Sequence, residues 1–467
     1  MSLIINAISA VGNNSSVYPL LVRDCGIEAP AKVVQTYNQN AKDSKRMATH
    51  ATRERLIDEY GTSAVWMGGV PVVEAIANKI IQTKTGLNGN VSLQLLETKK
   101  NSNVYKDVAQ NIEINIQKFK DKAPEAVKDL LNIKANAAKY KNISNRKYAI
   151  ALVVPMAIMG FVLPKANFGL TKYLIGKDIK SGKLPNPNKM PDMKKSAVSS
   201  KKGNPAFESL NSMKKSNTPS FKGLGTIVGS LSQTQKMAVT DGGLAVGRVG
   251  TSRGTNEKIE SLFKAGGMLL LNFVAPKYIE KILDKGTQAT FGIDTALDPK
   301  IMADKRFLVQ VKKNKLELPK KEAEVLDFID NNPESMLAKY TKKNKLVKFL
   351  DNGVRDPREF VNTEKVMNLA KNMRKFANEA SKSDSGVLKY AKKAIAAKSF
   401  NIVANVAISS ALLAIALPQA QFALRRFISG SNVDPGLIVA DNKESKKMDI
   451  KGWERRKIKN FSPDSLV

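Results

Sequence analysis

The chain has 467 residues, of which 42% are hydrophobic, and a formal net charge of +34. This length and apolar content allow two to four domains with sizeable cores, and they exclude a chain that is disordered throughout. The single cysteine, Cys25, and the single histidine, His50, exclude an internal disulfide framework, a metal site built from Cys and His, and a His-based catalytic triad.

The positive charge is carried mainly by lysines that are spread along the chain. A strongly basic protein commonly binds nucleic acid or an anionic membrane surface. Because these lysines do not gather with arginines and aromatic residues in one patch, the pattern favours solvated lysine-rich surfaces over base-specific recognition. Nucleic-acid binding therefore stays open as a secondary hypothesis.

Two uncharged runs in the first part of the chain predict apolar helices. Residues 61–73 predict a helix near 61–80, but 13 uncharged residues are fewer than the roughly 20 of a membrane span, which favours a core, re-entrant or interfacial segment. Residues 148–164 are 17 uncharged residues, and the apolar character continues to residue 175. This length predicts a membrane-embedded helix at 148–175.

Residues 177–236 change composition abruptly, because lysines are set there among Pro, Ser, Asn and Gly. Such a segment buries too little apolar surface to offset the entropy of ordering it, so we predict a flexible linker. Beside a membrane it would bind anionic lipid headgroups, at about 1 kcal/mol for each basic residue near the surface.

After the linker, the order of the first part returns. Residues 265–276 are uncharged and predict a helix near 265–284. A soluble helical insertion is expected at about 300–395. Within it, the sequence Asp-Pro-Arg-Glu at residues 356–359 is typical of a helix N-cap.

The longest uncharged run lies near the end of the chain. Residues 399–424 are 26 uncharged residues, and they predict a membrane-embedded helix at 399–428. A polar, basic tail follows at 431–467.

Both long apolar runs end in the motif Leu-Pro-x-Ala-x-Phe-x-Leu, which aligns without a gap. Its residues are Leu163, Pro164, Ala166, Phe168 and Leu170 in the first copy, and Leu417, Pro418, Ala420, Phe422 and Leu424 in the second. A shorter likeness, Val-x-Asp-x-Gly, contains Asp24 and Asp241, which we interpret as turn residues beside glycine. We therefore predict an internal duplication, with repeats at 1–176 and 237–430.

The predicted fold is all-α and internally duplicated, with two to four membrane-embedded helices and soluble amphipathic helices. If all four apolar helices are embedded, the halves are parallel repeats. If only the two long ones cross, the matching motifs lie on opposite faces, as in an inverted repeat. We favour four segments. A soluble pseudo-dimer that buries both long helices is the alternative, and basic flanks on every run leave the orientation open.

One glycine-rich stretch is a weak candidate for an anion-binding loop. It contains Gly247, Arg248, Gly250 and Arg253, so glycines would admit a phosphate and arginines would pair with it. The stretch matches neither the Walker A pattern nor the dinucleotide-binding fingerprint. A flexible loop that precedes a membrane segment and binds no ligand is the interpretation that we favour.

No catalytic constellation is present in the sequence, and we expect no enzymatic activity, cofactor or metal. The leading hypothesis is a multi-pass membrane scaffold or assembly component whose partner is the lipid bilayer. A small transporter or channel built from the two repeats is the alternative, and a soluble nucleic-acid-binding protein is the second. No basic residue precedes the short apolar start of the chain, so we expect no cleavable signal peptide.

Overall fold

The computed structural model describes residues 3–12, 18–96, 110–184, 231, 233–435 and 437. These residues are all-helical, and their only β-type pairing is an isolated bridge between Phe349 and Arg355. The all-α prediction is therefore confirmed. Most of the predicted linker and the basic tail beyond residue 437 lie outside the described residues.

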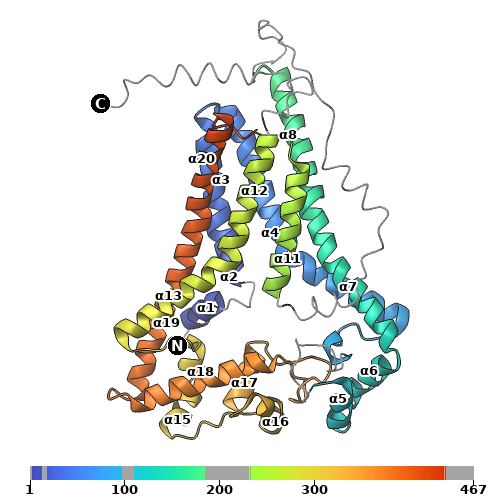
Figure 1. Cartoon of the computed structure of the whole chain (residues 1–467), viewed down its shortest axis with the longest axis vertical. Coiled ribbons are helices and arrows are strands. Elements are labelled where there is room, and N and C mark those ends of the chain that lie inside the picture. Colours follow the sequence, from blue (N-terminus) through green and yellow to red (C-terminus); the bar gives the residue numbers. More distant parts are fainter. Residues whose placement is uncertain are drawn as a thin grey trace.

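Six long helices of the described chain form a closed bundle, and each half of the chain contributes three of them (Figure 1). In the first half, the first long helix is made of α2 (Tyr18–Leu20), η1 (Leu21–Glu28) and α3 (Ala29–Ala41). The second is α4 (Lys45–Thr85), and the third is made of α7 (Ala137–Ala157), η4 (Ile158–Val162) and α8 (Leu163–Lys180). In the second half, the first long helix is α11 (Gln233–Thr251). The second is made of α12 (Thr255–Leu269), η7 (Leu270–Val274) and α13 (Ala275–Phe291), and the third of α19 (Val387–Ala411), η9 (Leu412–Ala416) and α20 (Leu417–Ser429).

The two halves interlock. The first helix of each half packs against the last helix of the other: α3 against η9 and α20, and α11 against α7 and η4. A short N-terminal helix, α1 (Leu3–Gly12), lies against α19. The ring of helices therefore closes only when both halves are present.

The two longest helices run in the same direction and finish at the same end of the bundle (Figure 1). At that end, Arg46 at the start of α4 donates to Asp178 near the end of α8, with 2.6 Å between Nη2 and Oδ1. Asn432, just after α20, donates to Asp43, just before α4, at 3.1 Å. The two copies of the motif therefore point the same way, which contradicts the inverted arrangement.

Within the described residues, four prolines of the bundle each follow a short π-helical segment: Pro30, Pro164, Pro276 and Pro418. The residue before each proline donates its N–H to the carbonyl five residues earlier, as Leu163 does to Ile158 and Leu417 to Leu412. A proline ring clashes with the carbonyl four residues before it. The wider π turn relieves this clash, so the helix continues through the proline.

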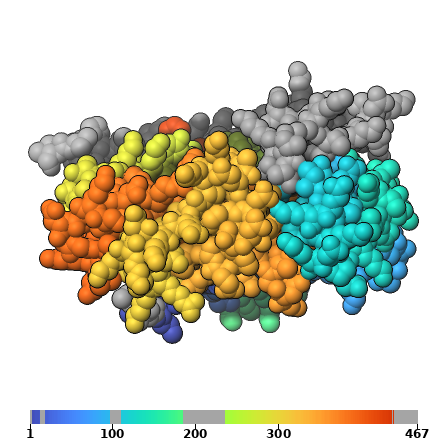
Figure 2. Space-filling model, turned by 90° about the horizontal axis from the view of Figure 1, so that it is seen from below, coloured from blue at the N-terminus to red at the C-terminus, as the bar shows by residue number. Residues whose placement is uncertain are grey.

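Below the bundle, segments from both halves form one small helical subdomain. It contains α5 (Ile112–Phe119), α6 (Pro124–Ala135), α14 (Pro299–Met302), α15 (Lys305–Lys312), α16 (Val325–Asn331), α17 (Met336–Lys343) and α18 (Thr363–Lys382). Figure 2, seen from this end, shows first-half residues in cyan directly beside second-half residues in yellow and orange. Lys118 pairs with Asp330 at 2.8 Å and Arg358 with Asp129 at 2.9 Å across this junction.

The helix predicted to begin after Asp356 begins later. Helix α18 starts at Thr363, and Asn362 is its N-cap, accepting from the N–H of Lys365 at 2.9 Å. The Asp356 carboxylate instead accepts from the guanidinium of Arg358 at 2.9 Å. This segment is held as a turn because its backbone bonds to the first half: the carbonyl of Arg358 accepts from the N–H of Ser92 at 2.8 Å.

The bundle carries apolar side chains on its outside. Three helices are long and apolar enough to span a membrane by length and composition: Lys45–Thr85, Ala137–Lys180 and Val387–Ser429. Among the exposed side chains on the bundle are Val72, Ile76, Ile150, Val153, Phe161, Val162, Val246, Leu262, Leu270, Phe400, Val403, Ile408 and Ile415. In water, this apolar surface would favour association of the protein with other molecules, whereas in a bilayer it would contact the apolar lipid chains.

Candidate functional site

The interior of the bundle contains a cavity of about 130 Å³ that both charged and apolar side chains line, with room for several water molecules or a small solute. Residues from all six helices line it. Its titratable lining groups are Glu54, Arg55, Asp58, Asp241, Arg248, Glu257, Glu260, Lys264, Arg425 and Asp434. Apolar side chains, among them Leu244, Met268 and Phe422, complete the wall.

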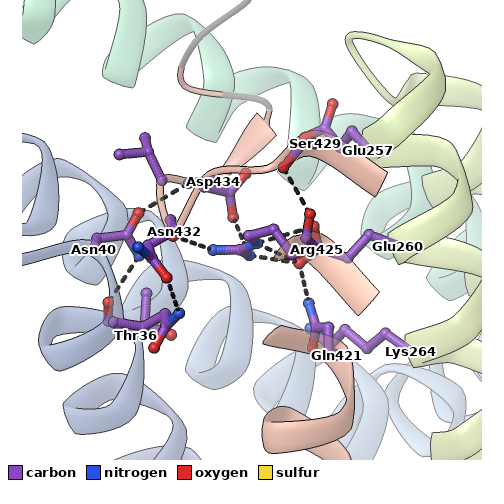
Figure 3. A network of polar contacts seen from close by, with 12 residues as sticks. Thr36, Asn40, Glu257, Glu260, Lys264, Gln421, Arg425, Ser429, Asn432 and Asp434 are labelled. Carbon is purple, nitrogen blue, oxygen red and sulfur yellow. Dashed lines mark hydrogen bonds and ion pairs between the residues drawn. The ribbon is translucent and has the colours of Figure 1, made fainter. Parts of the chain in front are cut away.

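Arg425 on α20 and Glu260 on α12 form the centre of the upper wall (Figure 3). The Arg425 side chain is 2% exposed, and its Nε donates to both carboxylate oxygens of Glu260 at 3.1 Å. Its two terminal nitrogens also reach the segment after α20, donating to the Asn432 carbonyl at 3.2 Å and to Asp434 at 3.1 Å. Gln421, one turn earlier, donates to Glu260 at 2.6 Å. Arg425 thereby fixes α12, α20 and the following segment together.

A second arginine occupies the adjacent wall. Arg253, just after α11, pairs with Glu54 on α4 at 2.7 Å and with Glu257 at 2.9 Å. The ring of Phe168 lies 3.9 Å from its guanidinium, a cation–π contact. The ring of Phe422 makes the same kind of cation–π contact with the guanidinium of Arg425, at 5.3 Å. Both phenylalanines of the repeated motif thus cover an arginine of the buried network.

Deeper in the bundle, charged groups from α4, α11 and α12 meet. Arg248 donates to Asp58 at 2.5 Å and to the Thr62 hydroxyl at 2.9 Å. Lys264 reaches Glu59 at 3.2 Å and Asp58 at 3.5 Å. Isolated charges in such an interior are strongly unfavourable, so each basic group here is held by at least one carboxylate.

The motif residues predicted from the sequence divide between the cavity and the packing around it. Pro164, Phe168 and Phe422 line the cavity. Leu163 and Leu417 pack against glycines of neighbouring helices, Pro418 is buried, and Leu424 is partly buried. Ala166, Leu170 and Ala420 are exposed on the outside of the bundle. The motif therefore has an inner and an outer face.

The candidate anion loop is not a loop. Gly247, Arg248 and Gly250 lie within helix α11, and Arg253 follows it. The glycines admit a neighbouring helix: a Cβ on Gly247 would lie 2.6 Å from the Cα of Gly160. Both arginines face carboxylates of this chain, so anion binding there would compete with the ion pairs already formed.

The buried network itself was not found from the sequence. Asp24 and Asp241 were interpreted as turn residues, but Asp24 lies in η1 and Asp241 in α11. The Asp24 side chain is 12% exposed, and Asp241 as a whole residue is 9% exposed. One available signal was overlooked. The second variable position of the motif is an amide in both copies, Asn167 and Gln421, and each donates inward to α4 or α12.

The chain was compared with protein-family models, curated proteins and solved structures. None of the three comparisons finds a match. Among the described residues, no group of three or more His, Cys, Asp or Glu side chains is placed to hold a metal ion. The cavity and its charged side chains are therefore the candidate functional site.

Proposed function

We propose that the six-helix bundle is embedded in a lipid bilayer. The supporting observation is the distribution of side chains: ten titratable groups line the cavity, and most side chains exposed along the long apolar runs are aliphatic or aromatic, with Lys165 and Lys172 as exposed exceptions. Ionisable residues within membrane helices face the bundle interior or a water-filled cavity, and they commonly mark a pathway for substrate or ions. A water-soluble bundle has the opposite distribution.

The two halves are proposed to be repeats of one three-helix unit. In support, corresponding residues make corresponding contacts in each half. Leu163 lies against Gly61, because a Cβ added to Gly61 would be 3.1 Å from the Leu163 side chain. Leu417 lies against Gly267 in the same way, because a Cβ added to Gly267 would be 2.4 Å from the Leu417 side chain. These paired contacts extend beyond the motif, because the glycines belong to α4 and α12.

The function that the cavity supports best is binding of a small charged solute during its passage across the membrane, the transporter or channel class. Membrane transporters built from two repeats commonly hold their substrate at the interface between the repeats. Here the cavity lies between the halves and takes residues from all six helices. We therefore place this class ahead of the scaffold that the sequence alone favoured.

The test compares two neighbouring residues of α12. Ser261 lines the cavity, whereas Leu262 is 63% exposed on the outside. Each is replaced by cysteine in a Cys25→Ser chain, in native membranes, and treated with a small, water-soluble, positively charged thiol reagent. Labelling of Ser261→Cys together with protection of Leu262→Cys is expected. Labelling of Leu262→Cys alone would contradict the proposal, because the outer surface would then be in water and the cavity closed.

A further inference from the structure

Asp241 differs from every other carboxylate that lines the cavity. Five of the lining acids are paired: Glu54 and Glu257 with Arg253, Asp58 with Arg248, and Glu260 and Asp434 with Arg425. Asp241 is only 9% exposed and lines the same cavity. In the part of the chain that the structure describes, its carboxylate forms no close ion pair, although Arg248 and Lys32 attract it from a longer distance.

The nearest basic side chains are already held by other acids. Arg248, two turns along the same helix, donates to Asp58 at 2.5 Å. Lys32, on α3, pairs with both Glu28 and Glu59. A largely buried carboxylate without an ion pair is unfavourable, so Asp241 would be stabilised by a positive partner, by water in the cavity or by a proton.

The charge of the cavity favours a positive partner. Its lining has six carboxylates and four basic groups, and Arg253, which pairs with two of these acids, is a fifth basic group. One negative charge therefore remains in excess in a chain whose net charge is +34. A surplus of acid inside so basic a protein is a local feature that attracts cations and disfavours anions. The described residues provide no three-ligand metal cluster, which disfavours a divalent ion.

The walls near Asp241 indicate what kind of cation fits. Leu244 and Ala245 follow it on α11, and Met268 and Leu269 face the same space from α12. Apolar side chains beside a carboxylate that holds no close ion pair are suited to a ligand that has an apolar body and a single positive group. The cavity of about 130 Å³ limits that ligand to a few non-hydrogen atoms.

We infer that Asp241 is the counter-ion for a small primary ammonium compound bound in this cavity. This assignment rests on the proposed function, because it names the class of solute for the same cavity. The ammonium group would donate hydrogen bonds to the Asp241 carboxylate, and its aliphatic part would contact Leu244 and Met268. No bond is made or broken in this binding.

Binding is measured on the purified full-length protein in detergent, with propylammonium chloride as the probe. The midpoint of thermal unfolding is followed against concentration, with sodium chloride at equal ionic strength and with propanol as references. A saturable rise, on the order of a few degrees, is expected for propylammonium alone. An equal rise with sodium chloride or with propanol would overturn the assignment.

Three variants locate the site. Asp241→Asn should lose the propylammonium-dependent rise, yet unfold at the same or a higher temperature without ligand, because it removes an unpaired buried charge. Asp24→Asn is the matched control: Asp24 does not line the cavity and already pairs with Arg23 at 3.2 Å, so this variant should keep the saturable rise. Ala245→Leu should abolish the rise by filling the cavity while the protein stays folded.

The assignment would be overturned if propylammonium still raised the unfolding midpoint of Asp241→Asn. It would also be overturned if propylammonium still raised the unfolding midpoint of Ala245→Leu. The detergent measurement does not depend on a bilayer. Loss of ligand binding with normal labelling of Ser261→Cys would therefore reject the ligand class alone. Normal ligand binding with labelling of Leu262→Cys would reject the membrane proposal alone.

Discussion

Gly160 in η4 and Gly247 in α11 bring the backbones of two helices from opposite halves of the chain into direct contact. A Cβ added to Gly247 would lie 2.6 Å from the Cα of Gly160, and one added to Gly243 would lie 2.4 Å from the sulfur of Met156. Gly243 and Gly247 are four residues apart, the small-residue spacing that lets membrane helices approach closely. This contact helps close the ring of helices around the cavity.

Gly247→Ala should therefore destabilise the bundle. Overpacking of this kind costs about 1–3 kcal/mol, since backbone atoms cannot move aside as a flexible side chain can. Gly242→Ala is the control, because nothing lies within 4 Å of its added Cβ and alanine favours helix. Thermal unfolding of both variants in detergent checks this. A Gly247→Ala protein as stable as Gly242→Ala would show that the close approach is absent.

The Arg425–Glu260 pair should be strongly coupled. Arg425→Met leaves Glu260 buried without its main partner and should cost about 3–5 kcal/mol. Glu260→Gln should cost less, because Arg425 keeps its ion pair with Asp434. The double variant should cost clearly less than the sum of the two, because it removes both members of the Arg425–Glu260 pair. Additive effects in this double-mutant cycle would mean that the two side chains do not interact.

The helical subdomain below the bundle should respond to acid through Asp304. Burial alone would raise the pKa of this carboxyl, but hydrogen bonds from Lys339 and Tyr340 outweigh burial and lower the pKa from 3.8 to about 2. Because the folded pKa lies below the unfolded one, the carboxylate stabilises the fold above pH 3.8, and this contribution is lost as the pH falls from 3.8 towards 2.

Asp304→Asn tests this dependence. The stability gap between the wild type and the variant should be largest near pH 7 and should narrow between about pH 4 and pH 2. Asp327→Asn, in the same subdomain, is the control, because that side chain is 73% exposed and its single ion pair is at the surface. A gap for Asp304→Asn that does not change with pH would contradict the assignment of the ionised form.

The helices were largely predictable from the sequence, whereas their inner faces were not. Uncharged runs located the long helices, and the repeated motif placed Pro164 and Pro418 at the same position of two apolar runs. Averages over a run cannot show which way a charge points, so Glu54 and Asp58, which both line the cavity, were not singled out. Asp24 and Asp241 were matched in the sequence and interpreted as turn residues, because an Asp beside glycine is commoner in turns, whereas both lie in helices.

The sidedness of the chain should follow the direction of the helices. Cysteines at Lys120 and Lys343, both exposed in the lower subdomain, should be labelled from the same side of the membrane. A cysteine at Lys183, exposed just after α8, should be labelled from the other side, because α8 carries the chain across before it. A membrane-impermeant maleimide on right-side-out and inverted vesicles distinguishes the sides. Labelling of Lys183→Cys from the side of Lys120→Cys would contradict a spanning α8.

The most direct test of the central claim, that lipid surrounds the bundle, is the collision of spin labels with oxygen and with a water-soluble nickel complex in reconstituted bilayers. Labels at Val153 and Val403, which are 59% and 56% exposed on the bundle, should collide more with oxygen. A label at Leu131, 51% exposed on the lower subdomain, should collide more with nickel. Nickel collisions at Val153 and Val403 as frequent as at Leu131 would contradict the account.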